Sequence, residues 1–110
     1  MFENTATVTT EKAAKYLVQL CKHFAHKVEV DYCETSGTVH FPPGPCAMHA
    51  DENTLTMQCR SESLRGVLMM QGILDSHLER FAWREEITIP WPKLDGEDAV
   101  RAQVAAEQQG

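Results

Sequence analysis

The chain has 110 residues, of which 43% are hydrophobic and 24% charged, and its formal net charge is −6. This length and balance predict one soluble globular domain with a single core. The acidic charge argues against non-specific binding of nucleic acid, which needs a basic surface, and no apolar run approaches the ~20 residues of a membrane span.

The N-terminal part of the chain predicts a strand followed by a helix. Residues 4–10 alternate threonines with Ala6 and Val8, as expected of a strand. Thr10 can cap a helix from Glu11 to about His26. The apolar residues of this helix recur at helical spacing and form one stripe. They are Ala13, Leu17, Leu20, Cys21 and Phe24.

Residues 28–60 change from helical spacing to alternation and predict four short strands. Their apolar residues occupy every second position, so one face of the sheet is buried and the other is solvated. The connecting segments "TSG", "PPGP" and "DENT" are rich in turn residues. We expect all of "PPGP" to lie in a turn, because proline cannot join the interior of a strand. The pattern predicts an antiparallel meander.

A second helix is predicted after Ser61 or Ser63, either of which can cap it, and runs to about Trp83. Its main apolar stripe includes Leu64, Leu68 and Leu78. A second and patchier stripe holds Gly66, Met69, Met70 and Ile73. A helix that is apolar on two sides needs two partners. The sheet is one, and the other is the first helix or a second subunit.

The residues after the second helix predict one more strand and a tail. "EITIPW", residues 86–91, alternates Ile87, Ile89 and Trp91, and Pro90 confines this strand to a sheet edge or to its own end. Residues 92–110 hold only small and sparse apolar side chains, which predicts a disordered tail or a marginal helix. We therefore expect residues 1–91 to form a single α+β domain and residues 92–110 to form a C-terminal tail.

The predicted fold class is α+β with two layers. A largely antiparallel sheet of about five to six strands, with a central four-stranded meander, carries two helices on one face. The predicted order is β-α-β-β-β-β-α-β. The N-terminus has no apolar segment typical of a secretory signal, and the four cysteines include no C-x-x-C pair. We therefore expect free thiols and a cytoplasmic protein.

The segment "CKHFAHK", residues 21–27, contains three metal-ligand side chains within six residues. At about 100° per residue, Cys21 and His23 point roughly 160° apart on a helix, so they cannot share an ion. Cys21 belongs to the buried stripe. His23 and His26 are three residues apart and their side chains can meet. They are candidate metal ligands, but a bound ion needs further donors.

A second group of candidate residues, His77, Arg80 and Arg84, lies along one face of the second predicted helix. If the two helices lie side by side, His23 and His26 would approach this face. The resulting cationic groove would attract a small anion or a chelated metal. The alternative is an ordinary solvent face on which nearby glutamates pair with the arginines, each exposed pair contributing only ~0–1 kcal/mol.

The remaining histidines and nucleophiles give weaker signals. His40 and His49 are expected on the outer face of the meander as diagonal neighbours, ~7–8 Å apart. They have no third ligand at a diagnostic spacing, so exposed polar positions are the preferred interpretation. No serine lies in a G-x-S-x-G motif and no cysteine lies in an evidently basic setting. The sequence therefore favours a protein that is not an enzyme.

Three segments carry a family resemblance: "YLVQLCKHFAHKVEVDY", "GTVHFPPGPCAMHAD" and "SHLERFAWREEITIPW". Together they resemble the bacterial domain of unknown function DUF2218 from Thr5 to about Trp91. The resemblance places His23, His26, His77 and both arginines inside the family motifs. It also implies an association with flavin-dependent siderophore-interacting reductases, and hence an accessory role in iron uptake or reduction.

The sequence thus predicts a non-enzymatic, cytoplasmic accessory module that binds a small anionic or iron-containing ligand between its helices. No cofactor is predicted beyond such a ligand. The first alternative is a protein-interaction module that acts as a homodimer through Met69, Met70 and Ile73. The second is a metal-dependent enzyme that uses the same histidines.

Overall fold

A computed structural model of the protein describes residues 1–109. Five strands form one antiparallel sheet, and the spatial order of the strands is β1-β5-β4-β3-β2. Their bounds are β1 Phe2–Thr9, β2 Val30–Tyr32, β3 Ser36–Phe41, β4 Gly44–Ala50 and β5 Thr54–Ser61. The helices are α1 Ala13–Phe24, α2 Leu64–Phe81 and α3 Glu97–Gln109. The predicted α+β class with a central meander is confirmed.

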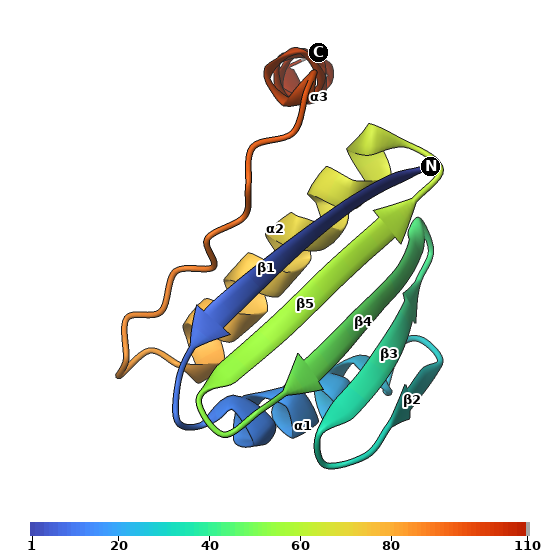
Figure 1. The fold of residues 1–110 in the computed structure, drawn as a ribbon. Helices are drawn as coiled ribbons and strands as arrows, with labels where there is room; N and C mark the ends of the chain where they lie inside the picture. Colours follow the sequence, from blue (N-terminus) through green and yellow to red (C-terminus); the bar gives the residue numbers. More distant parts are fainter. Residues whose placement is uncertain (110) are drawn as a thin grey trace.

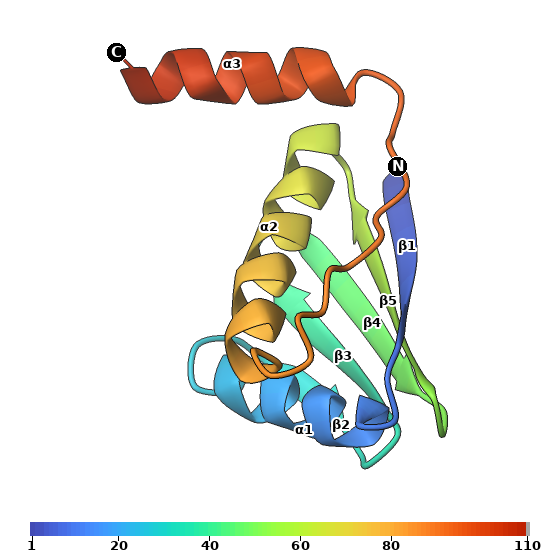
Figure 2. The same cartoon turned by 90° about the vertical axis from the view of Figure 1, so that its left-hand side faces the viewer.

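Helices α1 and α2 cover one face of the sheet and leave the other face open (Figures 1 and 2). Helix α2 packs on β1 and β5, while α1 packs on β3 and β4. The buried side chains alternate along β1, β4 and β5, as the sequence pattern predicts. The largest fully buried ones include Leu17, Leu20, Leu55, Met57, Met70, Leu74 and Leu78. The core therefore lies between this sheet face and the two helices. Within residues 1–109, every helix is too short or too polar to span a membrane.

Helix α2 begins at the predicted capping residue Ser63, whereas α1 begins at Ala13, and the residue before it, Lys12, makes no side-chain capping bond. Thr10 therefore lies before α1 and does not cap it. The hydroxyl of Thr10 accepts a hydrogen bond from the backbone N–H of Lys12 at 3.1 Å. The hydroxyl of Ser63 accepts one from the N–H of Gly66 at 3.0 Å. Ser63 thus satisfies an N–H group that the first turn of α2 leaves without a partner, whereas Thr10 binds within the turn that precedes α1.

The "PPGP" turn is shorter than predicted. Strand β3 ends at Phe41 and pairs directly with Gly44, so only Pro42 and Pro43 form the turn. Pro45 lies inside β4, opposite His40. The prediction that all four residues lie outside a strand is therefore wrong. Gly44 is required here because a Cβ atom would overlap the carbonyl oxygen of Arg60 on β5.

The predicted strand at residues 86–91 is also wrong, because no strand forms after α2 within the described residues. The segment still runs in the gap between α2 and β1 (Figure 2), and Ile89 is buried in the core. Pro90 and Pro92 lack the N–H that a ladder would need. Instead, the side chain of Asn4 on β1 donates a hydrogen bond to the carbonyl oxygen of Pro92 at 2.8 Å.

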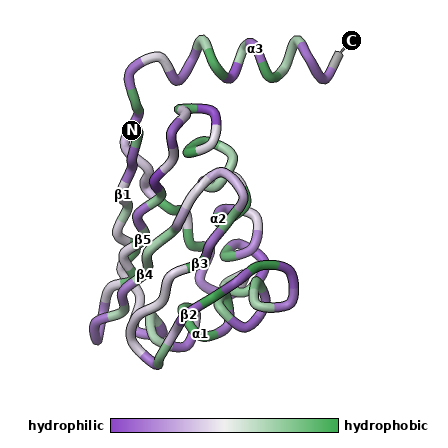
Figure 3. The backbone as a smooth tube through the Cα atoms, turned by 90° about the vertical axis from the view of Figure 1, so that its right-hand side faces the viewer, coloured by the Kyte–Doolittle hydropathy of each residue, from purple (hydrophilic) through white to green (hydrophobic). Residues whose placement is uncertain are grey.

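Residues 97–109 form helix α3, which lies across the N-terminal end of α2 (Figure 2). Hydrophilic and hydrophobic residues alternate along it (Figure 3), and Val100 and Val104 are half-buried. The guanidinium of Arg65 on α2 forms an ion pair with the carboxylate of Glu107 on α3, with an N–O distance of 2.6 Å. The element order is therefore β-α-β-β-β-β-α-α.

Candidate functional site

A pocket of about 240 Å³ lies between the C-terminal end of α1 and the middle of α2. Helix α1 and the turn that follows it form one side, α2 forms the other, and β3 contributes to the floor. Seven residues line the pocket: His23, Phe24, Lys27, Val28, Phe41, Ile73 and His77. Most of this lining is aromatic or aliphatic, and no acidic residue belongs to it.

The two histidines of the pocket lie against each other. The ring centroids of His23 and His77 are 4.7 Å apart, with 55° between the ring planes. The ring of Phe24 lies 4.9 Å from that of His77 and 4.9 Å from that of Phe41. The ring of Phe81 also packs on this group, with its centroid 5.8 Å from that of His23. The imidazoles therefore belong to a continuous aromatic cluster, which we call the His23–His77 pocket.

A backbone contact orients the His77 ring. Its Nδ1 atom lies 2.7 Å from the carbonyl oxygen of Ile73, one helical turn earlier. A carbonyl oxygen only accepts hydrogen bonds, so Nδ1 carries the proton in this contact. In the neutral ring, Nε2 then keeps its lone pair. This arrangement is common for histidines that bind a metal or hold a ligand, because the second contact fixes the tautomer and the ring.

Positive charge surrounds His23. Partial burial lowers the pKa of His23, and the charges of His77, Lys27, Arg80 and His26 lower it further. All five causes act in the same direction, because each disfavours one more positive charge at this point. An anion that enters the pocket would reverse the electrostatic part of this effect.

A separate contact holds the two helices in place. The hydroxyl of Tyr16 on α1 donates a hydrogen bond to the carboxylate of Glu85, just after α2. The hydroxyl of Thr10 donates to the same carboxylate at 3.0 Å. Burial is the largest cause that raises the pKa of Tyr16 to about 12, and the hydrogen bond to Glu85 and the negative charge of Glu85 raise it further. This clamp ties the start of α1 to the end of α2 and thereby limits how far the helices can separate.

Comparison with known proteins identifies the family. Residues 5–92 match the family described as an uncharacterized protein conserved in bacteria, DUF2218. The chain belongs to the DUF2218 family. The NMR structure of PA4090 from Pseudomonas aeruginosa is similar, with a TM-score of 0.72 and 35% sequence identity over 84% of this chain and 96% of that chain. No curated protein matches the chain. The predicted family resemblance is confirmed, and α3 lies outside the matched residues.

The DUF2218 fold brings some of the predicted site residues together and leaves others apart. His23 and His77 share the pocket, whereas His26 is exposed and does not line it. Arg80 is exposed on α2 near His23. Arg84 follows the end of the helix, and its guanidinium carbon lies 5.0 Å from the centroid of the Trp83 ring. In the part of the chain that the structure describes, no three His, Cys, Asp or Glu residues are placed to hold a metal ion.

Several pocket residues of this DUF2218 domain were not singled out from the sequence. The sequence predicts Phe24 only as part of the buried helical stripe, and Phe41 and Lys27 are not among the candidate residues. A signal was nevertheless present. Ile73, His77 and Phe81 are four residues apart in turn, which places them along one side of α2. That side faces α1 because His23 packs on it.

The two outer histidines do not form a site together. His40 pairs with Pro45, whereas His49 pairs with Ser36, so the two are not the diagonal neighbours that we expected. The cause is the two-residue turn, which shifts the register of β3 and β4 from the one that a four-residue turn would set. Each histidine has its own carboxylate, Asp31 for His40 at 3.4 Å and Asp51 for His49 at 3.1 Å.

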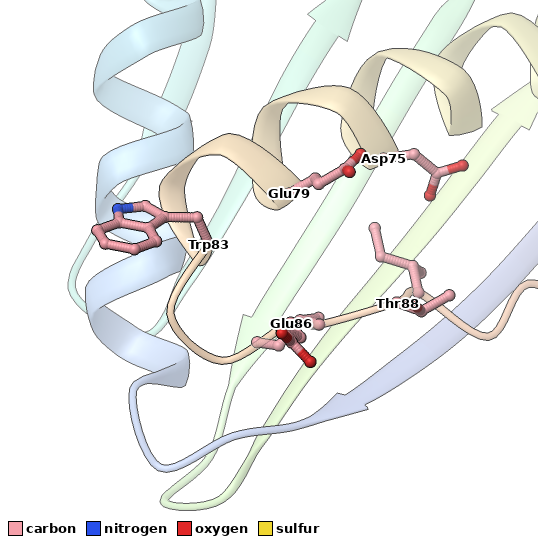
Figure 4. Close-up of a pocket in the computed structure, with 7 residues that line it drawn as sticks. Asp75, Glu79, Trp83, Glu86 and Thr88 are labelled. Carbon is pink, nitrogen blue, oxygen red and sulfur yellow. The ribbon is translucent and has the colours of Figure 1, made fainter.

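A larger and acidic cavity of about 530 Å³ lies between α2 and the segment after it. Figure 4 shows Asp75 and Glu79 on α2 with Glu86 and Thr88 on that segment, while the Trp83 side chain points away from them. The indole N–H of Trp91 donates to Asp75 at 2.9 Å, and burial raises the pKa of Asp75. The sequence analysis does not predict this cavity, although Asp75 and Glu79 are four residues apart and therefore lie on one side of α2.

Proposed function

We propose that this DUF2218 domain is a non-enzymatic accessory module that binds a small anionic ligand in the His23–His77 pocket. The observation that carries the proposal is the contact between the two imidazoles, whose ring centroids are 4.7 Å apart beside Lys27. Imidazole and ammonium groups are hydrogen-bond donors when protonated. A bound anion would stabilise the protonated form of His23, whose pKa is lowered by burial and, further, by the neighbouring positive charges.

The composition of the pocket supports binding more than catalysis. Its seven lining residues include no carboxylate, hydroxyl or thiol that could act with the histidines as an acid, base or nucleophile. Apolar side chains form its floor, as in ligand-binding pockets that use a few polar groups to orient the ligand. An accessory role beside a flavin-dependent siderophore-interacting reductase would fit such a module.

An iron-containing ligand is the second form of this proposal. His77 offers its Nε2 atom, because its Nδ1 atom contacts the carbonyl oxygen of Ile73. Residues 1–109 contain no set of three donors for a metal ion, so an iron ion would have to arrive with most of its ligands attached. Such a chelate would bind at the mouth of the pocket through one or two imidazoles.

The test is a titration of the full chain with inorganic phosphate and, separately, with ferric citrate. Binding is followed by isothermal titration calorimetry, and for phosphate also by the NMR signals of the two imidazoles. We expect saturable binding that a His23→Ala/His77→Ala double variant loses. A His40→Ala/His49→Ala double variant on the open sheet face is the matched control. Equal affinity in the pocket variant and the unaltered chain would refute the site.

Association between two copies is a second proposal with its own observation. Met69 on α2 is 51% exposed, although Met70 is fully buried and Ile73 lines the pocket. Met69 also borders a groove of about 370 Å³ between α2 and α3. Light scattering at high micromolar concentration would detect a dimer, which Met69→Lys should dissociate. A monomer at that concentration would refute the proposal.

A further inference from the structure

The size of the His23–His77 pocket restricts the ligand. Its volume is about 240 Å³, whereas pockets for drug-sized ligands have roughly 300–1,000 Å³. An apolar cavity of about 150 Å³ accommodates one benzene molecule. The pocket therefore accommodates a single ring with one small substituent, and it is too small to enclose a macrocycle or a complete metal chelate.

The walls of the pocket favour a flat ring. The planes of Phe24 and Phe41 meet at 77° with a centroid distance of 4.9 Å. The planes of Phe24 and His77 meet at 54° at the same distance. Steep angles of this kind present ring edges and ring faces together, and aromatic rings prefer edge-to-face or offset contacts to other packing. A third ring in the pocket can make both kinds of contact.

The charges around the pocket favour one negative group on that ring. Lys27 is the only lining residue with a permanent charge, and Arg80 and His26 add positive charge near His23. The lining includes no acidic residue to repel an anion. A planar carboxylate matches this setting, because it can accept hydrogen bonds from the ammonium group and from a protonated imidazole.

We propose that the ligand class of the His23–His77 pocket is a monocyclic aromatic carboxylate. Its ring packs against Phe24 and Phe41, and its carboxylate lies at the rim that His23, Lys27 and His77 form. This inference rests on the proposed function, since it names the chemistry of the anion that the pocket binds.

The experiment compares benzoate, cyclohexanecarboxylate and inorganic phosphate as ligands of the full chain. Binding is followed by the imidazole signals of His23 and His77 in NMR spectra. Benzoate should bind roughly threefold to tenfold more tightly than cyclohexanecarboxylate, because only the aromatic ring gains the edge-to-face contacts. Benzoate should also move the ring signals of Phe24 and Phe41.

Two variants test the two halves of the ligand. Lys27→Met should weaken benzoate binding about fivefold, whereas Lys22→Met, in the last turn of α1 and outside the pocket, should leave it unchanged. Ile73→Trp should fill the pocket and abolish binding. If Ile73→Trp does not fold, the Lys27→Met and Lys22→Met pair still decides whether benzoate uses this rim.

The outcomes separate this inference from the proposed function. Equal affinity for benzoate and cyclohexanecarboxylate would overturn the aromatic class. Phosphate binding at the two histidines without benzoate binding would also overturn it, while leaving the proposed anion site intact. If neither benzoate nor phosphate moves the imidazole signals, both the ligand class and the proposed function are wrong.

Discussion

The hydroxyl of Tyr16 donates a hydrogen bond to the carboxylate of Glu85, which lies 69 residues later in the chain. Thr10 donates to the other oxygen of the same carboxylate. One exposed side chain after α2 thus satisfies two hydroxyls at the start of α1. The His23–His77 pocket lies at the other end of α1, so the contacts of Glu85 with Tyr16 and Thr10 help to set the position of His23 relative to His77.

Replacing Glu85 by Gln should lower the pKa of Tyr16. The pKa should fall below about 12, because the negative charge of Glu85 disappears, and stay above the ordinary 10.0, because burial is the larger cause of the shift. Ultraviolet absorbance of the phenolate measures this in a Tyr32→Phe background. Glu79→Gln, at an exposed glutamate on α2, is the control. An unchanged pKa in Glu85→Gln would show that the clamp does not form.

The same shift predicts how stability depends on alkaline pH. Folded Tyr16 keeps its proton to about pH 12, whereas in the unfolded chain the pKa is near 10.0. The folded state therefore binds more protons between these values, and the free energy of unfolding falls as pH rises through this window. Glu85→Gln should reduce this fall, which urea denaturation at several alkaline pH values would measure.

The pKa of His23 should lie below the ordinary value of 6.5, because burial and four neighbouring groups lower it. His77→Gln removes one of those charges and should raise the pKa part of the way back, since burial remains the largest cause. NMR titration of the imidazole ring protons measures the change. His49→Gln on the open face should not alter the pKa of His23. A pKa of His23 at or above 6.5 in the unaltered chain would contradict the positive charge that we place around this ring.

The lowered pKa of His23 also determines how the free energy of unfolding depends on pH. The unfolded chain binds the proton more readily than the folded one, so the contribution of His23 is fully present above about pH 6.5. It is lost as pH falls through the lowered pKa. An anion such as phosphate should oppose this loss if it binds beside the protonated ring.

Much of the fold could be predicted because its signals are local. Ser63 caps α2 through a hydrogen bond from a residue three positions later, and Thr10 accepts one from Lys12 in the turn before α1. Such contacts depend on short spacing alone. Alternation along β4 and β5 identified the buried face for the same reason. The register of β3 and β4 depended on which residues of "PPGP" form the turn, and a turn shorter by two residues moved His40 away from His49.

The pocket could be predicted only in part, since it depends on the packing of two helices. His23 and His77 were expected to meet if the helices lay side by side. The positions of Phe24 and Phe41 under the imidazoles depend on how α1 lies across the sheet, which periodicity does not specify. The missing strand at residues 86–91 has a similar cause. Ile87 and Ile89 alternate as in a strand, but Ile89 is buried in the core and Ile87 is partly buried against it without a ladder.

Gln71→Met should destabilise the domain because it leaves a buried donor without one of its partners. Gln71 is 2% exposed, and its side-chain oxygen accepts a hydrogen bond from Asn4 at 2.8 Å. An unsatisfied buried amide costs about 1–3 kcal/mol, and urea denaturation should show a loss of that size. Gln103→Met, at an exposed position on α3, should change the free energy of unfolding little. Equal effects of the two substitutions would show that the Asn4–Gln71 contact contributes nothing.

Two glycines should respond in opposite directions to replacement by alanine. In Gly44→Ala the new methyl group would overlap the carbonyl oxygen of Arg60, a backbone atom that cannot move without displacing β5. We expect a loss of about 3 kcal/mol, as for overpacking in a rigid setting. Gly72 lies inside α2, and a methyl group added there would have no neighbouring atom within 4 Å. Gly72→Ala should therefore stabilise the domain by about 1 kcal/mol, the difference in helix propensity. Thermal unfolding of both variants measures the contrast, and a stable Gly44→Ala variant would mean that the Pro42–Pro43 turn does not press β4 against β5.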